Sequence, residues 1–325
     1  MVRKVAVVLL NLGGPDSLES VEGFLYSMFS DRYIVDIQVI ARLAFAKVIS
    51  KLRARSTRKI YEIMGGKSVL LEETTRQAAC LEERLNNNPE SVNVEYRVFV
   101  CMRHSAPRAT EVLCKTHSFN PDKVVLLPLY PQYSCATTQS AIQDWYSGAY
   151  ELGYVFDTDI VWSYHDHDTY IDSCCRLILD KYEHALSISN RPRVLFSAHS
   201  LPVSFIKKGD PYQQQIIKTV DLLIKKMCVP SLDYVICYQS KVGPVRWLEP
   251  STKSEIIRAH IDDVPVVVAP IAFVSENSET LVELDIEYKA IMKQKRFFRV
   301  PTVGTEKRFT ECLYDLVTQK LQVGT

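Results

Sequence analysis

The stretch Arg193-Val-Leu-Phe-Ser-Ala-His199-Ser-Leu-Pro202 joins a short apolar run to a loop of small polar residues that ends in proline. Such a change is typical of a buried strand that ends in a functional loop. In an open α/β sheet, ligands bind beyond the carboxyl ends of the strands, so His199 lies where chemistry is expected. A lone histidine is more often a hydrogen-bonded structural residue, and the rest of the chain has to decide between the two roles.

The composition is that of an ordinary globular protein. The 325 residues carry 39 basic and 38 acidic side chains and are 47% hydrophobic, which predicts two domains and argues against a nucleic-acid partner. Nine cysteines without a C-x-x-C pair predict reduced thiols rather than a disulfide framework or a zinc ribbon. No apolar stretch approaches the ~20 residues that span a bilayer. The start of the chain offers no signal-peptide cleavage site, so we expect a cytoplasmic protein.

Short β-branched runs alternate with helical patterns, which is typical of βαβ units and parallel sheets. Most runs are continuously apolar, as expected when helices cover both faces of a sheet. The predicted strands are Val5–Leu10, Val94–Met102, Lys123–Leu129, Tyr154–Val161, Arg193–Phe196, Asp233–Cys237 and Val264–Ala269. We therefore expect an α/β fold of two similar domains, one formed by residues 1–148 with a returning segment 302–325, the other by residues 149–301.

Two amphipathic helices are predicted between the first two strands. The first begins near Asp16, which can form a capping box with Glu19. The second lies within residues 34–60 and becomes strongly basic before Gly65-Gly66 ends it. This basic run is either a solvated helix face or a lip that meets an anionic ligand or a lipid surface.

Six of the predicted strands run into loops that combine proline or glycine with aromatic or polar side chains. If the strands are parallel, these loops share one edge of the molecule and line a single cleft. The candidate walls of this cleft are apolar or aromatic: Leu12, Tyr130, Tyr133, Trp247 and Phe273. Such a cleft suits a large, flat hydrophobic ligand. Neither G-x-G-x-x-G nor G-x-x-x-x-G-K-[ST] occurs, so we expect no nucleotide cofactor.

A second polar constellation contains Glu279, Glu283 and Glu287 at a spacing of four residues. On a helix these carboxylates form one stripe that starts at the cleft and leads away from it. Like charges at this spacing destabilise a helix unless a cation relieves them. The stripe is either a solvated acidic face or a path for a divalent metal, and its start at the same edge as His199 favours the functional role.

Several motifs in this order resemble those of the ferrochelatase family: Leu10–Pro15, Tyr130–Thr138, Ser197–Pro202, Gly209–Tyr212, Gln239–Pro244 and Glu279–Tyr288. The resemblance covers nearly the whole chain. It implies two Rossmann-like, chelatase-type domains with a porphyrin cleft between them. It also implies the insertion of Fe²⁺, a substrate metal, into protoporphyrin IX to give protohaem, the terminal step of haem biosynthesis.

The resemblance further implies roles for individual residues. His199 and Glu279 would bind the metal and act in catalysis. From the stripe itself, we expect Glu279 to bind the metal or to relay protons outward, with Glu283 and Glu287 as the relay for protons or metal. An imidazole with its ordinary pKa of about 6.5 suits a base that accepts pyrrole protons. A lip at residues 34–64 would meet the inner face of a membrane as a peripheral contact. The implied porphyrin-binding residues are Leu12, Arg53, Met64, Arg103, Tyr130, Ser200, Trp247 and Phe273.

Two departures from the family pattern matter. Asn277 stands where many relatives carry a histidine, which removes a candidate third metal ligand. Cys135 matches one iron–sulfur ligand, but its three C-terminal partners are absent, so we expect no [2Fe–2S] cluster, which needs four ligands. Two alternatives remain beside a protoporphyrin ferrochelatase. One is a chelatase for another tetrapyrrole such as sirohydrochlorin, and the other is a tetrapyrrole carrier that performs no chemistry.

Overall fold

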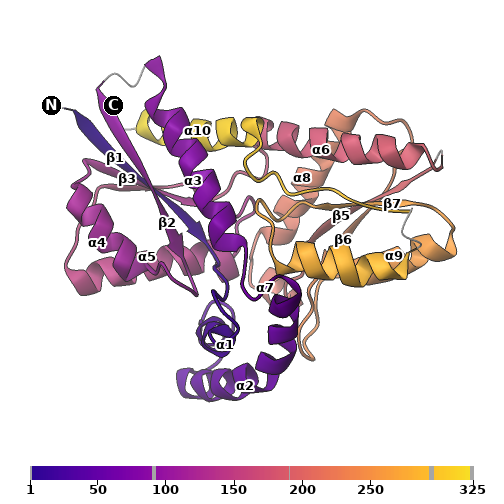
Figure 1. Cartoon of the computed structure of the whole chain (residues 1–325), viewed down its shortest axis with the longest axis horizontal. Helices are drawn as coiled ribbons and strands as arrows, with labels where there is room; N and C mark the ends of the chain where they lie inside the picture. Colours follow the sequence, from indigo (N-terminus) through magenta and orange to yellow (C-terminus); the bar gives the residue numbers. More distant parts are fainter. Residues whose placement is uncertain (1, 90–92, 190, 293–295, 323–325) are drawn as a thin grey trace. The chain divides into compact units, whose positions relative to one another are not determined.

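The computed structural model describes residues 2–89, 93–189, 191–292 and 296–322. The chain divides into two compact units, of which the first comprises Met1–Ser163 with Thr310–Thr325 and the second Tyr164–Phe309. Each unit is built on one four-stranded sheet with helices on both sides (Figure 1). All of the paired strands run parallel, so the predicted α/β class is confirmed.

The first unit contains the sheet β2-β1-β3-β4. Its strands are β1 (Arg3–Asn11), β2 (Val94–Met102), β3 (Lys123–Pro128) and β4 (Thr158–Ile160). Its helices are α1 (Val21–Phe29), α2 (Val39–Ile63), α3 (Leu70–Asn86), α4 (Ala109–Phe119), the π-helix η2 (Cys135–Gln139), α5 (Ser140–Leu152) and most of α10 (Lys307–Gln322). The carboxyl ends of β1, β2 and β3 therefore share one edge.

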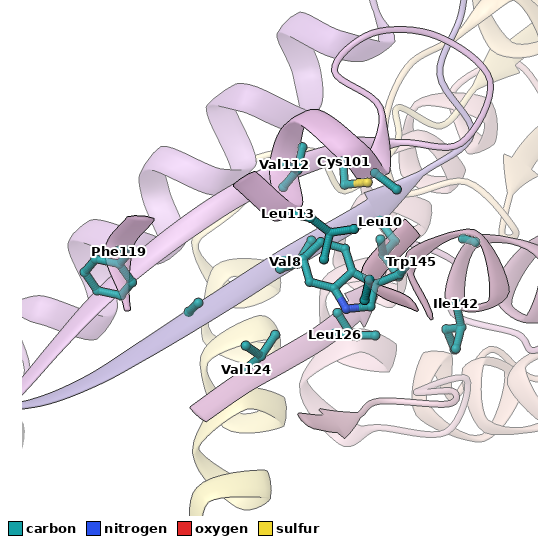
Figure 2. Close-up of a cluster of buried hydrophobic side chains, with 14 residues drawn as sticks. Val8, Leu10, Cys101, Val112, Leu113, Phe119, Val124, Leu126, Ile142 and Trp145 are labelled. Atoms are coloured by element: carbon teal, nitrogen blue, oxygen red, sulfur yellow. The ribbon is translucent and has the colours of Figure 1, made fainter. Parts of the chain in front are cut away.

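The centre of this unit explains why β1 is apolar without alternation. Residues 5–10 of β1 are at most 1% exposed, because helices cover both faces of the sheet. On one face, Trp145 of α5 and Leu113 of α4 lie against Val8 and Leu126 (Figure 2). On the other face, α3 packs along β2 and β1. This packing fixes where the loops after the strands emerge.

The second unit contains the sheet β6-β5-β7-β8. Its strands are β5 (Arg193–His199), β6 (Asp233–Gln239), β7 (Val266–Pro270) and β8 (Phe297–Arg299). Its helices are α6 (Asp168–Leu186), α7 (Val203–Lys207), α8 (Tyr212–Met227), α9 (Thr252–Ile261), the π-helix η3 (Glu279–Tyr288) and the 3₁₀ turn η4 (Lys289–Ile291). Figure 1 shows α6 and α9 on opposite sides of this sheet, and η3 shares the core on the α9 side.

The division between the units differs from the predicted one. The first unit continues to Ser163 rather than ending near residue 148, because β4 pairs with β3 through Val124 and Thr158. The returning segment joins the first unit from Thr310 rather than from residue 302. The last three residues of the predicted segment, 323–325, lie outside the described residues.

The start of one predicted helix is wrong, and another helix has a different form from the one its spacing indicates. Helix α1 begins at Val21, because Ser17 and Ser20 close the preceding turn by exchanging hydrogen bonds from N–H to Oγ, and Asp16 does not cap the helix. The predicted α-helical stripe after Glu279 is a π-helix, in which backbone bonds join residues five apart. Strand β8 was not predicted, although its Phe-Phe-Arg run is a β-type pattern.

Candidate active site

His199 is the last residue of β5 and pairs with Gln239 at the end of β6. Its Nδ1 lies 2.7 Å from the carbonyl oxygen of Ser200, and its Nε2 lies 3.4 Å from Oε1 of Glu279. The Tyr212 hydroxyl donates to the His199 carbonyl at 3.0 Å, which fixes the main chain beneath the ring. Both ring nitrogens therefore face oxygen acceptors, an arrangement that favours the protonated imidazolium.

The charge state of His199 follows from these neighbours. Burial alone would lower the pKa of His199, but the charge and hydrogen bond of Glu279 oppose it, with smaller help from the Ser200 carbonyl and Glu283, and raise the pKa to about 9. His199 is thus protonated at neutral pH. The expectation of a neutral imidazole near its ordinary pKa is wrong, because a carboxylate lies within ion-pair distance of Nε2.

Glu279 opens η3, and its peptide is bound on both sides. Its N–H donates to Oδ1 of Asn277 at 2.8 Å, and its carbonyl accepts from Nε2 of Gln239 at 3.1 Å. Asn277 also accepts from the N–H of Thr280 at 3.2 Å and donates to the Ser275 carbonyl at 3.1 Å. The amide of Asn277 is therefore engaged in capping η3.

Glu283, one turn further along η3, is a satisfied carboxylate. It accepts from the N–H and Oγ of Ser240 at 3.0 and 2.5 Å, from Nε2 of Gln239 at 3.4 Å and from the Tyr288 hydroxyl at 2.5 Å. Four donors from β6, its following loop and η3 thus tie this glutamate to the sheet edge. Glu287 is exposed. The stripe therefore contains one paired, one anchored and one solvated carboxylate.

A buried arginine on β8 holds η3 from the other side. The guanidinium of Arg299 makes a bidentate contact with Asp285, with distances of 2.7 to 3.0 Å, and a further contact of 2.5 Å to Glu276. Its side chain is 14% exposed. Paired carboxylates and a planar guanidinium give a geometrically specific clamp. π-Helical segments occur frequently at functional sites, and this clamp fixes one next to His199.

Two other predicted residues of the second unit, Ser200 and Phe273, lie next to His199, and Trp247 lies beside the loop that follows it. The Phe273 ring meets the His199 ring edge-on, with centroids 6.4 Å apart. Ser200 is buried, and its N–H donates to the Gln239 carbonyl at 2.8 Å. Trp247 forms an isolated antiparallel bridge with Pro202, and its buried indole Nε1 meets no acceptor among the described residues. One aromatic ring, that of Phe273, therefore lies against the imidazole of the ion pair.

The first unit carries a separate cluster at the carboxyl end of its sheet. Arg103 lies 2.9 Å from Asp31 and 3.3 Å from Asp144, and its N–H donates to the Asn11 carbonyl beside Leu12. Asp31 was not predicted, because the sequence around it carries no motif. Burial raises the pKa of the Tyr130 phenol, whose hydroxyl has no hydrogen-bond partner in the described part of the chain.

Arg53 lies on helix α2, and Met64 caps the end of that helix. Neither residue belongs to the segments that form the Arg103 cluster. Met64 packs against the small core formed by α1 and α2, and burial lowers the pKa of Arg53. The outer side of α2 is apolar as well as basic, since Ile40 and Leu52 are each 72% exposed. No helix in the described ranges is long and apolar enough to cross a membrane.

The site offers few protein ligands for a metal ion. Across the described ranges, no group of three or more His, Cys, Asp or Glu side chains is arranged to hold a metal ion. His199 and Glu279 supply one imidazole nitrogen and one carboxylate. This nitrogen and oxygen pair suits a ferrous ion and lacks soft thiolate ligands, which fits a metal that is handed on rather than kept.

The sequence profile described as Ferrochelatase matches residues 4–321. The chain belongs to the ferrochelatase family. Ferrochelatase from Wolbachia sp. subsp. Drosophila simulans (strain wRi) is 52% identical over 313 residues, covering 96% of this chain and 98% of that protein. Ferrochelatase from Pelagibacter ubique (strain HTCC1062) is 41% identical over 320 residues, covering 98% and 91%. Membership of this family makes the chain a metal chelatase and confirms the resemblance read from its motifs.

Solved structures agree with the fold of a ferrochelatase-family protein. The sirohydrochlorin chelatase SirB from Bacillus subtilis subspecies spizizenii, in complex with cobalt, aligns with a TM-score of 0.53 at 10% identity, covering 97% of this chain and 94% of that chain. SirB from Bacillus subtilis with Fe³⁺ aligns with a TM-score of 0.52 at the same identity and covers 97% and 95%. At this identity the likeness concerns the fold alone, and it confirms the chelatase-type architecture.

Proposed function

We propose that this chelatase inserts Fe²⁺ into protoporphyrin IX to give protohaem, with Glu279 binding the metal and His199 accepting the pyrrole protons. The observation that carries the proposal is the ion pair between Nε2 of His199 and Oε1 of Glu279, 3.4 Å apart at the carboxyl end of the second sheet. Family membership supports the reaction, and the pair supplies the two functions that the reaction requires: a metal ligand and a base.

The proton balance assigns an order to the steps. Metallation removes two pyrrole protons and replaces them with one dication. His199 is protonated in the free protein, so it must lose a proton before it can accept one. A ferrous ion on Glu279 neutralises the carboxylate that keeps His199 charged, and His199 then releases its proton to solvent. The neutral imidazole then takes the two pyrrole protons one after the other and passes the first to solvent before it accepts the second. The metal and the imidazolium proton therefore compete, and metal arrival creates the base.

The aromatic side chains have a separate task. Phe273 lies edge-on to His199, and Trp247 lies beside the loop that follows it. Walls of this kind would bind the flat macrocycle and bend it toward the geometry that exposes pyrrole nitrogens to the metal. Binding that favours the bent form lowers the barrier, because it stabilises the transition state more than the substrate.

The outer glutamates of the stripe, Glu283 and Glu287, have different roles. We assign the relay of protons or metal to Glu287, because its carboxylate is exposed. Glu283 already accepts four hydrogen bonds, so we assign it mainly to anchoring η3, with its charge adding to the field at His199. Metal would then pass along the solvated end of the stripe toward Glu279.

The proposed reaction needs no iron–sulfur cluster, because Fe²⁺ keeps its oxidation state throughout. Cys135, the residue matched to a cluster ligand, begins the π-helix η2 and is half-buried. We expect purified protein to contain no stoichiometric labile sulfide. Two equivalents of iron and labile sulfide per chain would contradict this part of the proposal.

An anaerobic metallation assay with Fe²⁺ and protoporphyrin IX tests the proposal. We expect turnover by the native protein and a loss of at least about 100-fold in Glu279→Gln, since a metal ligand is removed. Quenching of tryptophan fluorescence by added porphyrin should stay unchanged in this variant. A carrier would bind porphyrin without metallating it, and a sirohydrochlorin chelatase would metallate that substrate but not protoporphyrin IX.

A further inference from the structure

We propose that Gln239 and Asn277 are positioning residues that hold the backbone of Glu279 and so fix its carboxylate opposite His199. The inference rests on the proposed roles of His199 and Glu279 and extends them to two residues that do not touch the reacting atoms.

Gln239 connects three segments of the site. It is 1% exposed, and its main chain pairs with that of His199. Its Oε1 accepts from the Ser197 hydroxyl at 2.7 Å, and its Nε2 donates to the Glu279 carbonyl at 3.1 Å and to Glu283 at 3.4 Å. Because one end of the amide accepts and the other donates, its orientation is fixed. The strand that carries His199 is thereby linked to the first residue of η3.

Asn277 holds the opposite side of the same residue. Its Oδ1 accepts from the N–H of Glu279 at 2.8 Å, while its Nδ2 is anchored on the Ser275 carbonyl at 3.1 Å. The peptide units on both sides of Glu279 are thus bound by side chains from β6 and from the loop after β7. None of these bonds uses the Glu279 carboxylate, which stays available to His199 and to a metal.

A purely structural role is the alternative, and the chain offers a matched control. Thr252 is fully buried, and its hydroxyl lies 2.7 Å from the Ser197 hydroxyl and 3.3 Å from the Cys237 sulfur. It belongs to the same buried network as Gln239 but, within the described part of the chain, makes no hydrogen bond to η3. Loss of Thr252 should therefore weaken the sheet without releasing Glu279.

The kinetic test compares Gln239→Met, Asn277→Ala and Thr252→Val. Misplacement of a catalytic group by about 1 Å can cost about 100-fold, so we expect the first two variants to lose about 10- to 100-fold in kcat with the KM for porphyrin unchanged. Asn277→Asp should recover most of the loss, because its carboxylate can accept the same N–H. Thr252→Val should stay within about two-fold of native kcat, even at lower stability.

Combination with Glu279→Gln separates positioning from general damage. If Gln239 acts only through the Glu279 carboxylate, Gln239→Met should cause no further loss of turnover in the Glu279→Gln background. Additive losses would overturn the proposal, because they would show that Gln239 acts by another route. A native kcat in both Gln239→Met and Asn277→Ala would overturn it as well.

Crystal structures of the variants test the position of the Glu279 carboxylate directly, independently of turnover. In Gln239→Met and Asn277→Ala we expect Glu279 Oε1 to move beyond the ~4 Å ion-pair limit from His199 Nε2, and in Thr252→Val to stay near its native place. A Glu279 carboxylate still at 3.4 Å in both variants overturns the positioning role. Displacement in the variants together with native turnover in Glu279→Gln leaves positioning intact and instead refutes the catalytic role of Glu279.

Discussion

The protonation of His199 decides what the residue can do. Its pKa is raised to about 9 by Glu279, although burial acts in the opposite direction. In Glu279→Gln the charge is gone and the desolvation remains, so we expect the pKa to fall to the ordinary ~6.5 or below. An NMR titration of the His199 ring protons in native protein and variant measures both values. A pKa that stays near 9 in Glu279→Gln would show that another group holds the proton.

Competition between metal and proton predicts a pH dependence. A metal on Glu279 displaces the His199 proton, so the apparent KM for metal should fall about ten-fold per unit as pH rises from 6 toward 9 and then level off. Zn²⁺ is the convenient probe because it does not oxidise. The slope should persist in Glu287→Gln, because its exposed carboxylate is not among the groups that shift the pKa of His199. A KM for metal that is constant between pH 6 and 8 would contradict the competition.

At the scale of single residues, the sequence indicates which side chains carry the chemistry but not their protonation or their contacts. His199 and Glu279 stand out because a histidine and a carboxylate stripe begin at strand ends. The raised pKa of His199 could not be predicted, since it depends on a 3.4 Å distance between distant segments. Asn277 looked like the loss of a ligand, whereas its amide caps η3. Asp31, which pairs with Arg103, had no sequence motif at all.

The helix η3 shows how an element can tolerate a stripe of like charges. From the sequence, the repulsion between these carboxylates could be relieved by a bound metal or by solvent at an exposed face. For Glu283 the protein uses four hydrogen-bond donors instead. Clamping by Arg299 through Asp285 then keeps η3 on the sheet. The carboxylate pattern was therefore read correctly as a stripe, but its π-helical form depends on tertiary contacts that spacing does not encode.

The two outer glutamates of η3 should differ in their effect on stability. Glu283→Gln places an NH₂ group among donors, and we expect a loss of about 1.5–3 kcal/mol in the free energy of unfolding. Glu287→Gln alters an exposed side chain and should change it by less than about 0.5 kcal/mol. Urea unfolding followed by circular dichroism compares the two. Equal effects would refute the anchoring role of Glu283.

For the whole molecule, short β-branched runs, most of them continuously apolar, predicted seven of the eight strands found in the described residues and their parallel class, because strands covered on both faces need no alternation. The short β8 was missed since three residues give no period. The first unit extends past residue 148, because Gly148 lies within α5, Gly153 ends that helix and β4 still pairs with β3.

The outer surface of α2 supports a peripheral membrane contact, which we propose for this chain. Lys47, Lys51, Arg55 and Lys59 are all exposed at four-residue spacing, and apolar side chains such as Leu52 are exposed beside them. Like charges at this spacing repel one another, and an anionic lipid surface would relieve them. We infer that the charged stripe and the apolar side chains bind such a surface together.

Replacement of these four basic residues by glutamine should weaken binding to anionic vesicles by at least about 100-fold, since each basic residue near such a surface contributes about 1 kcal/mol. Cosedimentation with phosphatidylserine vesicles measures the change. Neutral phosphatidylcholine vesicles and a series of salt concentrations provide the controls. Equal binding of the native protein and the variant to anionic vesicles would refute the contact.

The central claim is that His199 takes the pyrrole protons, and the metallation rate of His199→Ala tests it most directly. The assay uses protoporphyrin IX with Fe²⁺ under anaerobic conditions, and fluorescence quenching checks that porphyrin still binds. Loss of a general base typically costs about 10²- to 10⁴-fold, and we expect a decrease of that size with binding preserved. A native metallation rate in His199→Ala would contradict the account.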